Sequence, residues 1–184
     1  VRWFSSGIAS AIATKLDLVA HPGGVVAQCE TGAEDADNER FLLACEPWFG
    51  VNVTRLRNPD FADTWAVWEK RRYMSGVAGA PCTSELKITP RLAFQEPGDV
   101  HVFGYTADQR DVERFANFKA NYPDLTVIAP LIERGITKAG CLALMQDVGI
   151  SPPRIYALGF PNANCVPCVK ATSPNYWALV RLRF

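Results

Sequence analysis

The sequence predicts an α/β protein with a doubly wound, mainly parallel five-stranded sheet in a three-layer α/β/α arrangement. Short apolar or β-branched runs alternate with segments of helical periodicity along the chain. The chain has 184 residues, which suits one compact domain, and it shows no internal repeat or low-complexity tract. Alternating strands and helices favour a parallel sheet, because each helix carries the chain back to the edge where the next parallel strand begins.

The predicted strands are short apolar runs bounded by turn residues. The first strand ends at Phe4, before a run of serine and glycine, and the second follows Pro22-Gly23. The third alternates β-branched with polar residues, which is typical of a strand whose two faces differ. The five predicted strands are Val1–Phe4, Gly24–Cys29, Val51–Leu56, Asp99–Gly104 and Leu125–Leu131.

The predicted helices fill the intervals between these strands. Asp37 is a favourable capping residue for the helix that follows it. Phe61, Trp65 and Trp68 recur at helical spacing, and Gly149 ends the last of the five helices. The predicted helices are Ile8–Leu16, Asp37–Cys45, Phe61–Tyr73, Gln109–Tyr122 and Thr137–Val148.

The chain is predicted to be organised around residues 1–150, which hold all the strands and form the α/β domain. Residues 151–184 are rich in Pro, Asn and Cys and form a C-terminal extension packed on the same domain, with a last helix near Tyr176. The Gly- and Ala-rich segment Met74–Pro81 is interpreted as a mobile loop at the active site.

Composition excludes some classes of protein. Lys and Arg together number 19 and so do Asp and Glu, so no overall charge favours nucleic acid or a membrane surface as partner. No apolar run is long enough for a transmembrane helix, and the first residues do not resemble a signal peptide. We therefore expect a cytoplasmic protein that does not bind a membrane.

The turn after the first strand is a candidate phosphate site. Ser5, Ser6, Gly7 and Ser10 lie where a strand passes into a helix. Backbone N–H groups and the positive end of the helix dipole favour an anion at such a turn, and glycine lets the backbone approach it closely. The alternative is an ordinary serine-capped turn without a ligand.

The carboxyl ends of the strands should lie at one edge of the sheet, where ligands of doubly wound folds bind. This rule places the loops Ser5–Ser10, Thr31–Asn38 and Gly104–Arg110, together with the segment after Leu131, on the ligand side. Lys87 is a further candidate, since its charge would neutralise a phosphate or sulfate oxyanion. Its alternative is a solvated lysine on a helix face.

Six cysteines in a reducing compartment indicate metal binding, redox chemistry or burial. Cys165 and Cys168 have the Cys-x-x-Cys spacing of a metal or redox pair. Cys82 and Cys141 would complete a set of four thiolates, which suits a four-iron four-sulfur cluster or tetrahedral zinc. For Cys141 burial in an apolar helix is the alternative, and the two remaining cysteines, Cys29 and Cys45, are interpreted as core residues.

Five segments together resemble the phosphoadenosine phosphosulfate (PAPS) reductase-like branch of the adenine-nucleotide α-hydrolase, or PP-loop, superfamily, in its short versions common in phages. They are similar to the nucleotide loop, the Thr-Gly turn, the Cys-x-x-x-x-Lys-x-x-Pro element, the Gly-x-Arg turn and the C-terminal Cys-x-x-Cys-x-Lys. The matching segments are Ser5–Ser10, Thr31–Glu34, Cys82–Pro90, Gly104–Arg114 and Asn164–Lys170.

The sequence also departs from the family pattern. Ser6 and Ala9 replace a glycine and an aspartate of the nucleotide loop, and Thr106 stands at the arginine of the Gly-x-Arg turn. The C-terminal Glu-Cys-Gly-Leu-His segment, which carries the catalytic cysteine of assimilatory reductases, is missing. These departures argue against ATP splitting and move the expected chemistry to the remaining cysteines.

The resemblance implies an enzyme that binds an adenine nucleotide (PAPS, adenosine phosphosulfate or ATP) and reduces a sulfonucleotide by thiol or iron–sulfur chemistry. It implies catalytic roles for Cys165, Cys168, Cys82 and Lys87, an external electron donor and a homo-oligomer. The implied nucleotide-binding residues are Ser5, Ser6, Gly7, Ser10, Thr31, Gly32, Glu34, Gly104 and Arg110.

Two alternatives remain open. One is an iron–sulfur dependent sulfurtransferase that thiolates a nucleoside or nucleic acid, which is the only interpretation that needs a nucleic acid partner. The other is a nucleotide-binding or iron–sulfur sensor module without turnover.

Overall fold

The computed structural model describes all 184 residues, Val1–Phe184, and contains a five-stranded, all-parallel sheet flanked by helices. The strand order is β3-β2-β1-β4-β5, and the strands are β1 (Arg2–Trp3), β2 (Val26–Cys29), β3 (Val53–Leu56), β4 (Val100–Val102) and β5 (Thr126–Ile128). Each lies within a predicted strand, so the predicted fold class is confirmed. The chain leaves the central strand β1 in both directions along the sheet, which is the doubly wound topology.

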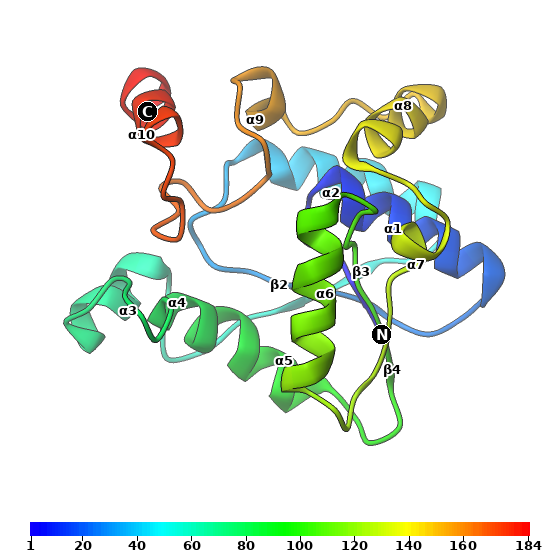
Figure 1. The fold of residues 1–184 in the computed structure, drawn as a ribbon, viewed down its shortest axis with the longest axis horizontal. Helices are drawn as coiled ribbons and strands as arrows, with labels where there is room; N and C mark the ends of the chain where they lie inside the picture. Colours follow the sequence, from blue (N-terminus) through cyan, green and yellow to red (C-terminus); the bar gives the residue numbers. More distant parts are fainter. The chain divides into compact units, whose positions relative to one another are not determined.

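The helices are α1 (Ile8–Ala20), α2 (Asp37–Phe49), α3 (Thr64–Arg71), α4 (Pro81–Thr83), α5 (Thr89–Phe94), α6 (Gln109–Asn121), α7 (Pro130–Glu133), α8 (Lys138–Val148), α9 (Arg154–Ala157) and α10 (Pro174–Arg183), with a π-helical segment, η1 (Ser84–Ile88), between α4 and α5 (Figure 1). The five helices predicted within residues 1–150 are present, and α10 lies where a last helix was predicted near Tyr176. Helix α3 starts at Thr64 rather than Phe61, because the Asp63 carboxylate accepts a hydrogen bond of 2.9 Å from the Ala66 N–H and caps the helix there.

The chain divides into two compact units, each built from separate segments. The first comprises Val1–Gln28, Glu39–Thr54 and Glu96–Pro153, and the second comprises Cys29–Asn38, Arg55–Gln95 and Arg154–Phe184. From Arg154 onwards, the C-terminal extension therefore belongs to the same unit as the loop after β2. The division of the chain at residue 150 stays a prediction.

The core of the first unit forms around Phe4, directly before the serine-rich turn. The ring of Phe4 packs against Phe41 and meets Phe49 edge-to-face, with centroids 6.1 Å and 5.5 Å apart. Ile8 and Ile12 on the inner face of α1 are also buried. Apolar burial on both sides of the turn fixes β1 and the start of α1, and so the backbone between them.

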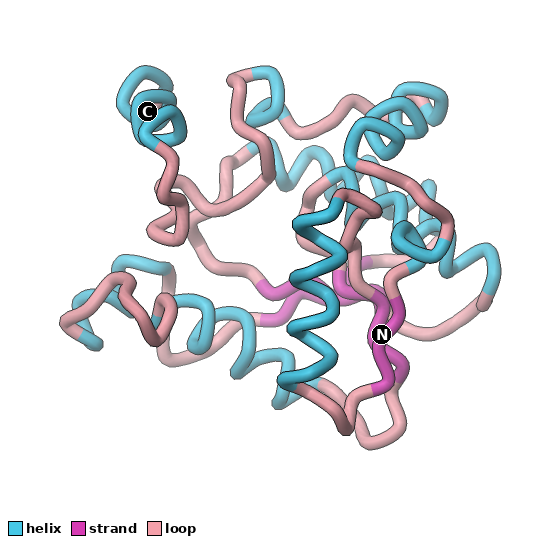
Figure 2. The backbone as a smooth tube through the Cα atoms, in the orientation of Figure 1, coloured by secondary structure: helices cyan, strands magenta, loops and turns pink.

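The second unit contains two small apolar clusters. Phe61, Val67 and Leu86 form one, with Cys82 packed against it. The other is built on Ile155, Phe160 and Tyr176, and side chains of the long loop between α9 and α10 pack against it; loops are drawn in pink in Figure 2. The irregular C-terminal extension is thus anchored by buried aromatic side chains. None of the helices is long and apolar enough to span a bilayer.

Candidate functional site

The side chain of Ser10 holds the serine-rich turn of the first unit together by hydrogen bonds. The Ser10 hydroxyl accepts hydrogen bonds of 3.1 Å from both the backbone N–H and the hydroxyl of Ser5, and donates to the Gly7 carbonyl over 2.9 Å. Gly7 is the N-cap of α1 and provides no capping side chain. An anion at this helix N-terminus would therefore not compete with a capping group.

Ser6 gives this turn its shape. Its φ is 54°, in the left-handed region that non-glycine residues rarely adopt, and its side chain is fully buried. The Ser6 hydroxyl donates to Gln28 Oε1 over 3.0 Å, so it points into the protein. A strained residue held by a buried hydrogen bond is typical of a functional turn.

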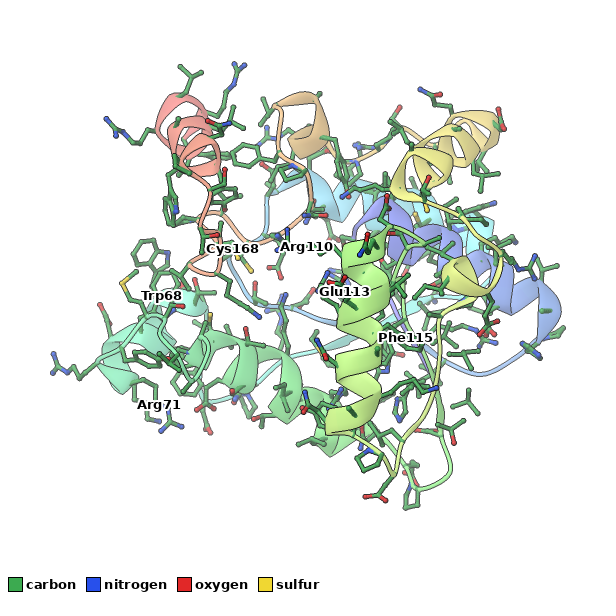
Figure 3. The ribbon with its side chains drawn as sticks, viewed as in Figure 1. Trp68, Arg71, Arg110, Glu113, Phe115 and Cys168 are labelled. Carbon is green, nitrogen blue, oxygen red and sulfur yellow. The ribbon has the colours of Figure 1, made fainter.

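Gly104 allows β4 to approach the same turn closely. A Cβ at this position would lie 2.6 Å from Ser10 Cα and 2.7 Å from Ser10 N, so only glycine fits there. Two residues further on, the buried Thr106 hydroxyl lies within hydrogen-bonding distance of the carboxylates of Asp108 and Asp111. Arg110 is exposed on the first turn of α6 (Figure 3).

Replacing Ser10 with alanine should lower the free energy of unfolding by about 1–2 kcal/mol, because the Ser5 N–H loses its acceptor and the Gly7 carbonyl its donor. Urea denaturation measures this change. Ser5→Ala removes a hydroxyl of the same turn on an exposed residue, and should change stability by less than about 0.5 kcal/mol. Equal effects of the two substitutions would contradict the central role of Ser10.

A hydrogen-bonded chain leads to Cys165 in the second unit. Glu34 Oε1 accepts from the Thr31 N–H over 2.9 Å and from the Thr31 hydroxyl over 2.7 Å. The Thr31 oxygen lies 2.9 Å from the sulfur of Cys165. The Thr31 hydroxyl has only one proton, which it can donate either to Glu34 or to the Cys165 sulfur. The Thr-Gly turn and the Cys-x-x-Cys pair, predicted separately, thus meet in one site.

The loop that carries Thr31 and Glu34 is also tied to the C-terminal extension. The guanidinium of Arg154 binds the buried carboxylate of Asp35 through two hydrogen bonds of 2.8 Å and 3.0 Å. The Val166 N–H donates to the Ala33 carbonyl over 2.8 Å. These contacts hold the segment before Cys168 against the loop.

The electrostatics of Cys165 combine opposing effects. Burial raises the pKa of its thiol, and the negative charge of Glu34 acts in the same direction. The charge of Lys87 and the hydrogen bond to Thr31 offset this increase only in part. Cys29, interpreted from the sequence as a core residue, is only partly buried, and its thiol lies 3.5 Å from the Lys87 carbonyl. Burial raises the pKa of Cys29 to about 11.

The predicted cluster ligands are divided between the two units. Cys82, Cys165 and Cys168 belong to the second unit, and Cys141 is fully buried in α8 of the first unit. No group of three Cys, His, Asp or Glu side chains has the arrangement needed to hold a metal ion. The four-iron four-sulfur cluster and the zinc ion therefore stay predictions.

Stability should fall as the pH rises above about 9. Burial raises the pKa of Cys141 to about 11 and that of Cys45 to about 12, so the folded state keeps both thiols protonated. The stabilisation from these protonated thiols is complete below the unfolded thiol pKa of about 8.5. Above that pH, each thiol lowers the free energy of unfolding by about 1.4 kcal/mol per pH unit. Urea denaturation between pH 8 and 11 measures the slope, which Cys45→Ala should reduce. If Cys45→Ala left the slope of stability against pH unchanged, the contribution of the Cys45 thiol would be contradicted.

No family model and no curated protein matches the chain. Among solved structures it is similar to the crystal structure of phosphoadenylyl-sulfate (PAPS) reductase from Candida auris, phosphate complex. The TM-score is 0.63 at 10% sequence identity, and the match covers 90% of this chain and 81% of that chain. This likeness confirms that the chain has a PAPS reductase-like fold.

Proposed function

We propose that this protein is a PAPS reductase-like enzyme, which binds an adenine nucleotide and transfers the sulfonate group of a phosphosulfate to a cysteine thiol. The similarity of fold to a PAPS reductase over 90% of the chain is the observation that carries the proposal. The Cys165 site supports it, because it combines a thiol, a hydroxyl and a nearby cation, as sulfur chemistry on an anionic substrate requires.

Nucleotide binding is assigned first to the turn between β1 and α1. Its phosphate-binding elements are the N-terminus of α1, the exposed hydroxyl of Ser5 and the backbone at Gly7, with Ser10 and Gly104 holding the turn in shape. Thr31 and Glu34, predicted as nucleotide-binding residues, are hydrogen-bonded to each other and next to Cys165. We assign them to the thiol site.

The proposed reaction begins when Cys165 loses its proton to a solvent base. The thiolate attacks the sulfur of the phosphosulfate, an S–S bond forms, and the bond from sulfur to the bridging oxygen breaks. The nucleotide leaves as adenosine bisphosphate, or as adenosine monophosphate if the substrate is adenosine phosphosulfate, and the sulfonate stays on Cys165. Lys87, whose charge favours the Cys165 thiolate, would also stabilise the negative charge of the transferred sulfonate.

The test is turnover of ³⁵S-labelled PAPS and adenosine phosphosulfate in the presence of a dithiol reductant. We expect labelled sulfite and a free nucleotide in equal amounts, and a loss of about 10³-fold or more in Cys165→Ser. Cys29→Ser is the matched control, since it alters another partly buried thiol of the second unit and should leave turnover unchanged. Nucleotide binding without release of sulfite would show a binding module instead of an enzyme.

A further inference from the structure

We infer that Cys165 and Cys168 form a self-resolving dithiol, in which Cys168 releases sulfite from sulfonated Cys165 without help from an external thiol. The inference deepens the proposed function and rests on it, because the sulfonated Cys165 is the product of the proposed first step. It assigns separate roles to the two cysteines of the pair, with Cys165 as the attacking thiol and Cys168 as the resolving thiol.

Tyr176 folds the segment between the two cysteines into a turn. Its phenol oxygen accepts a hydrogen bond of 2.6 Å from the Cys168 N–H and donates one of 3.3 Å to the Cys165 carbonyl. The two backbone atoms are therefore no further apart than these two distances together, whereas an extended segment of this length would span about 10 Å. A disulfide requires Cα atoms about 4.4–6.8 Å apart, a separation that a turn provides and an extended segment does not.

Tyr176 is itself held in place by apolar packing. It is 9% exposed, and its ring meets Phe160 edge-to-face with the centroids 5.4 Å apart. The side chain of Cys168 packs against the same apolar cluster. Figure 3 shows Cys168 on the loop between α9 and α10. The turn is thus fixed by a buried side chain, and we treat Tyr176 as a positioning residue for the dithiol.

The surroundings of the two thiols differ in a way that assigns their order. The sulfur of Cys165 lies 2.9 Å from the Thr31 hydroxyl, whereas the side chain of Cys168 packs against the apolar cluster of Tyr176. Cys168 has its backbone N–H engaged by Tyr176 and lies at the other end of the turn. The thiol with the polar neighbour is therefore assigned to meet the anionic substrate.

The resolving step balances in atoms and electrons. The Cys168 thiolate, its proton lost to solvent, attacks Sγ of sulfonated Cys165. A Cys165–Cys168 disulfide forms, the bond between Sγ and the sulfonate sulfur breaks, and sulfite leaves with the electron pair. The two thiols lose two electrons and the sulfonate sulfur gains two. An external dithiol is needed only to reduce the disulfide before the next turnover.

The test is a single turnover with the full chain in excess over ³⁵S-labelled PAPS and with no added thiol. We expect one labelled sulfite per nucleotide released, together with a Cys165–Cys168 disulfide found by peptide mapping. In Cys168→Ser the nucleotide should still be released, but the label should stay on Cys165 until a thiol is added. Cys29→Ser should behave like the unaltered protein.

The outcomes separate this inference from the proposed function. Nucleotide release with the label retained on Cys165 of the unaltered protein would overturn the self-resolving dithiol and leave the proposed function standing. Release of free sulfite by Cys168→Ser at the rate of the unaltered protein would also overturn the self-resolving dithiol and leave the proposed function standing. Absence of nucleotide release from the unaltered protein would overturn both.

A measurement without substrate tests the role of Tyr176. In glutathione redox buffers, Tyr176→Phe should lower the equilibrium constant for forming the Cys165–Cys168 disulfide by about tenfold, since the turn loses both hydrogen bonds. Trp177→Phe is the matched control, because it removes a hydrogen bond from the same helix to Ala171, outside the pair. An equal constant in the two variants would overturn the positioning role of Tyr176.

Discussion

Replacing Asp17 with leucine should lower the free energy of unfolding by about 3–5 kcal/mol, the largest effect on stability that we expect. The guanidinium of Arg2 is buried beside β1, and its Nε donates to Asp17 Oδ2 over 2.7 Å. Its other nitrogens donate to the carbonyls of His21 and Gly23. Without the carboxylate, a buried positive charge remains without its counter-charge. Urea denaturation at neutral pH measures the loss.

Two further variants separate the effect of the ion pair from the effect of any lost carboxylate. Asp124→Leu removes an exposed carboxylate of the same unit and should change stability by less than about 0.5 kcal/mol. The double variant Arg2→Met with Asp17→Leu should be more stable than Asp17→Leu alone, because no unpaired charge is left in the protein. A double variant less stable than Asp17→Leu would disprove the claim that the unpaired charge of Arg2 causes the loss of stability.

Gly32→Ala should disrupt the thiol site of the second unit and lower its stability by about 2–4 kcal/mol. Gly32 has a φ of 66°, and an added Cβ would lie 2.3 Å from the Ala62 carbonyl oxygen and 2.9 Å from Asp63 Cβ. The backbone must move to relieve these contacts, and the neighbouring Thr31 hydroxyl, which contacts Cys165, would move with it. We expect a changed rate of Cys165 alkylation by iodoacetamide, read by mass spectrometry, together with a lower urea midpoint.

Gly50→Ala is the control for this substitution. Gly50 has a similar φ of 80°, but an added Cβ there would meet no atom within 4 Å. The control therefore carries the backbone strain of about 1–2 kcal/mol without the steric clash. Equal losses of stability in the two variants, with unchanged Cys165 alkylation, would contradict the importance of the close approach at Gly32.

The architecture could be read from the sequence because it depends on local patterns. Apolar runs at β-strand spacing and the glycine at position 149 are local signals, and the structure ends helix α8 at that glycine. The helical segments from Pro81 to Phe94 were not predicted, since Pro90 interrupts the usual helical pattern. Within this region the structure has the π-helical segment η1, directly before α5.

The candidate site was only partly visible in the sequence. The serine-rich turn was predicted from local residue types, but the inward direction of the Ser6 hydroxyl follows from its partner Gln28, which lies on another strand. The hydrogen bond between Thr31 and Cys165 joins residues 134 positions apart. No spacing rule could indicate it, because the contact depends on how the loop after β2 and the C-terminal extension pack together.

Sequence alone therefore determined the class of fold and the order of its elements, and it predicted a phosphate site at the serine-rich turn and a chemical role for the Cys-x-x-Cys pair. These features depend on neighbouring residues, whose spacing controls burial and backbone conformation. Only the tertiary structure decided which side chains surround each thiol. It buried Cys141 in the first unit, placed Thr31 and the charge of Lys87 close to Cys165, and folded the pair around the Tyr176 hydroxyl. Such contacts arise from packing between distant segments, which local periodicity does not encode.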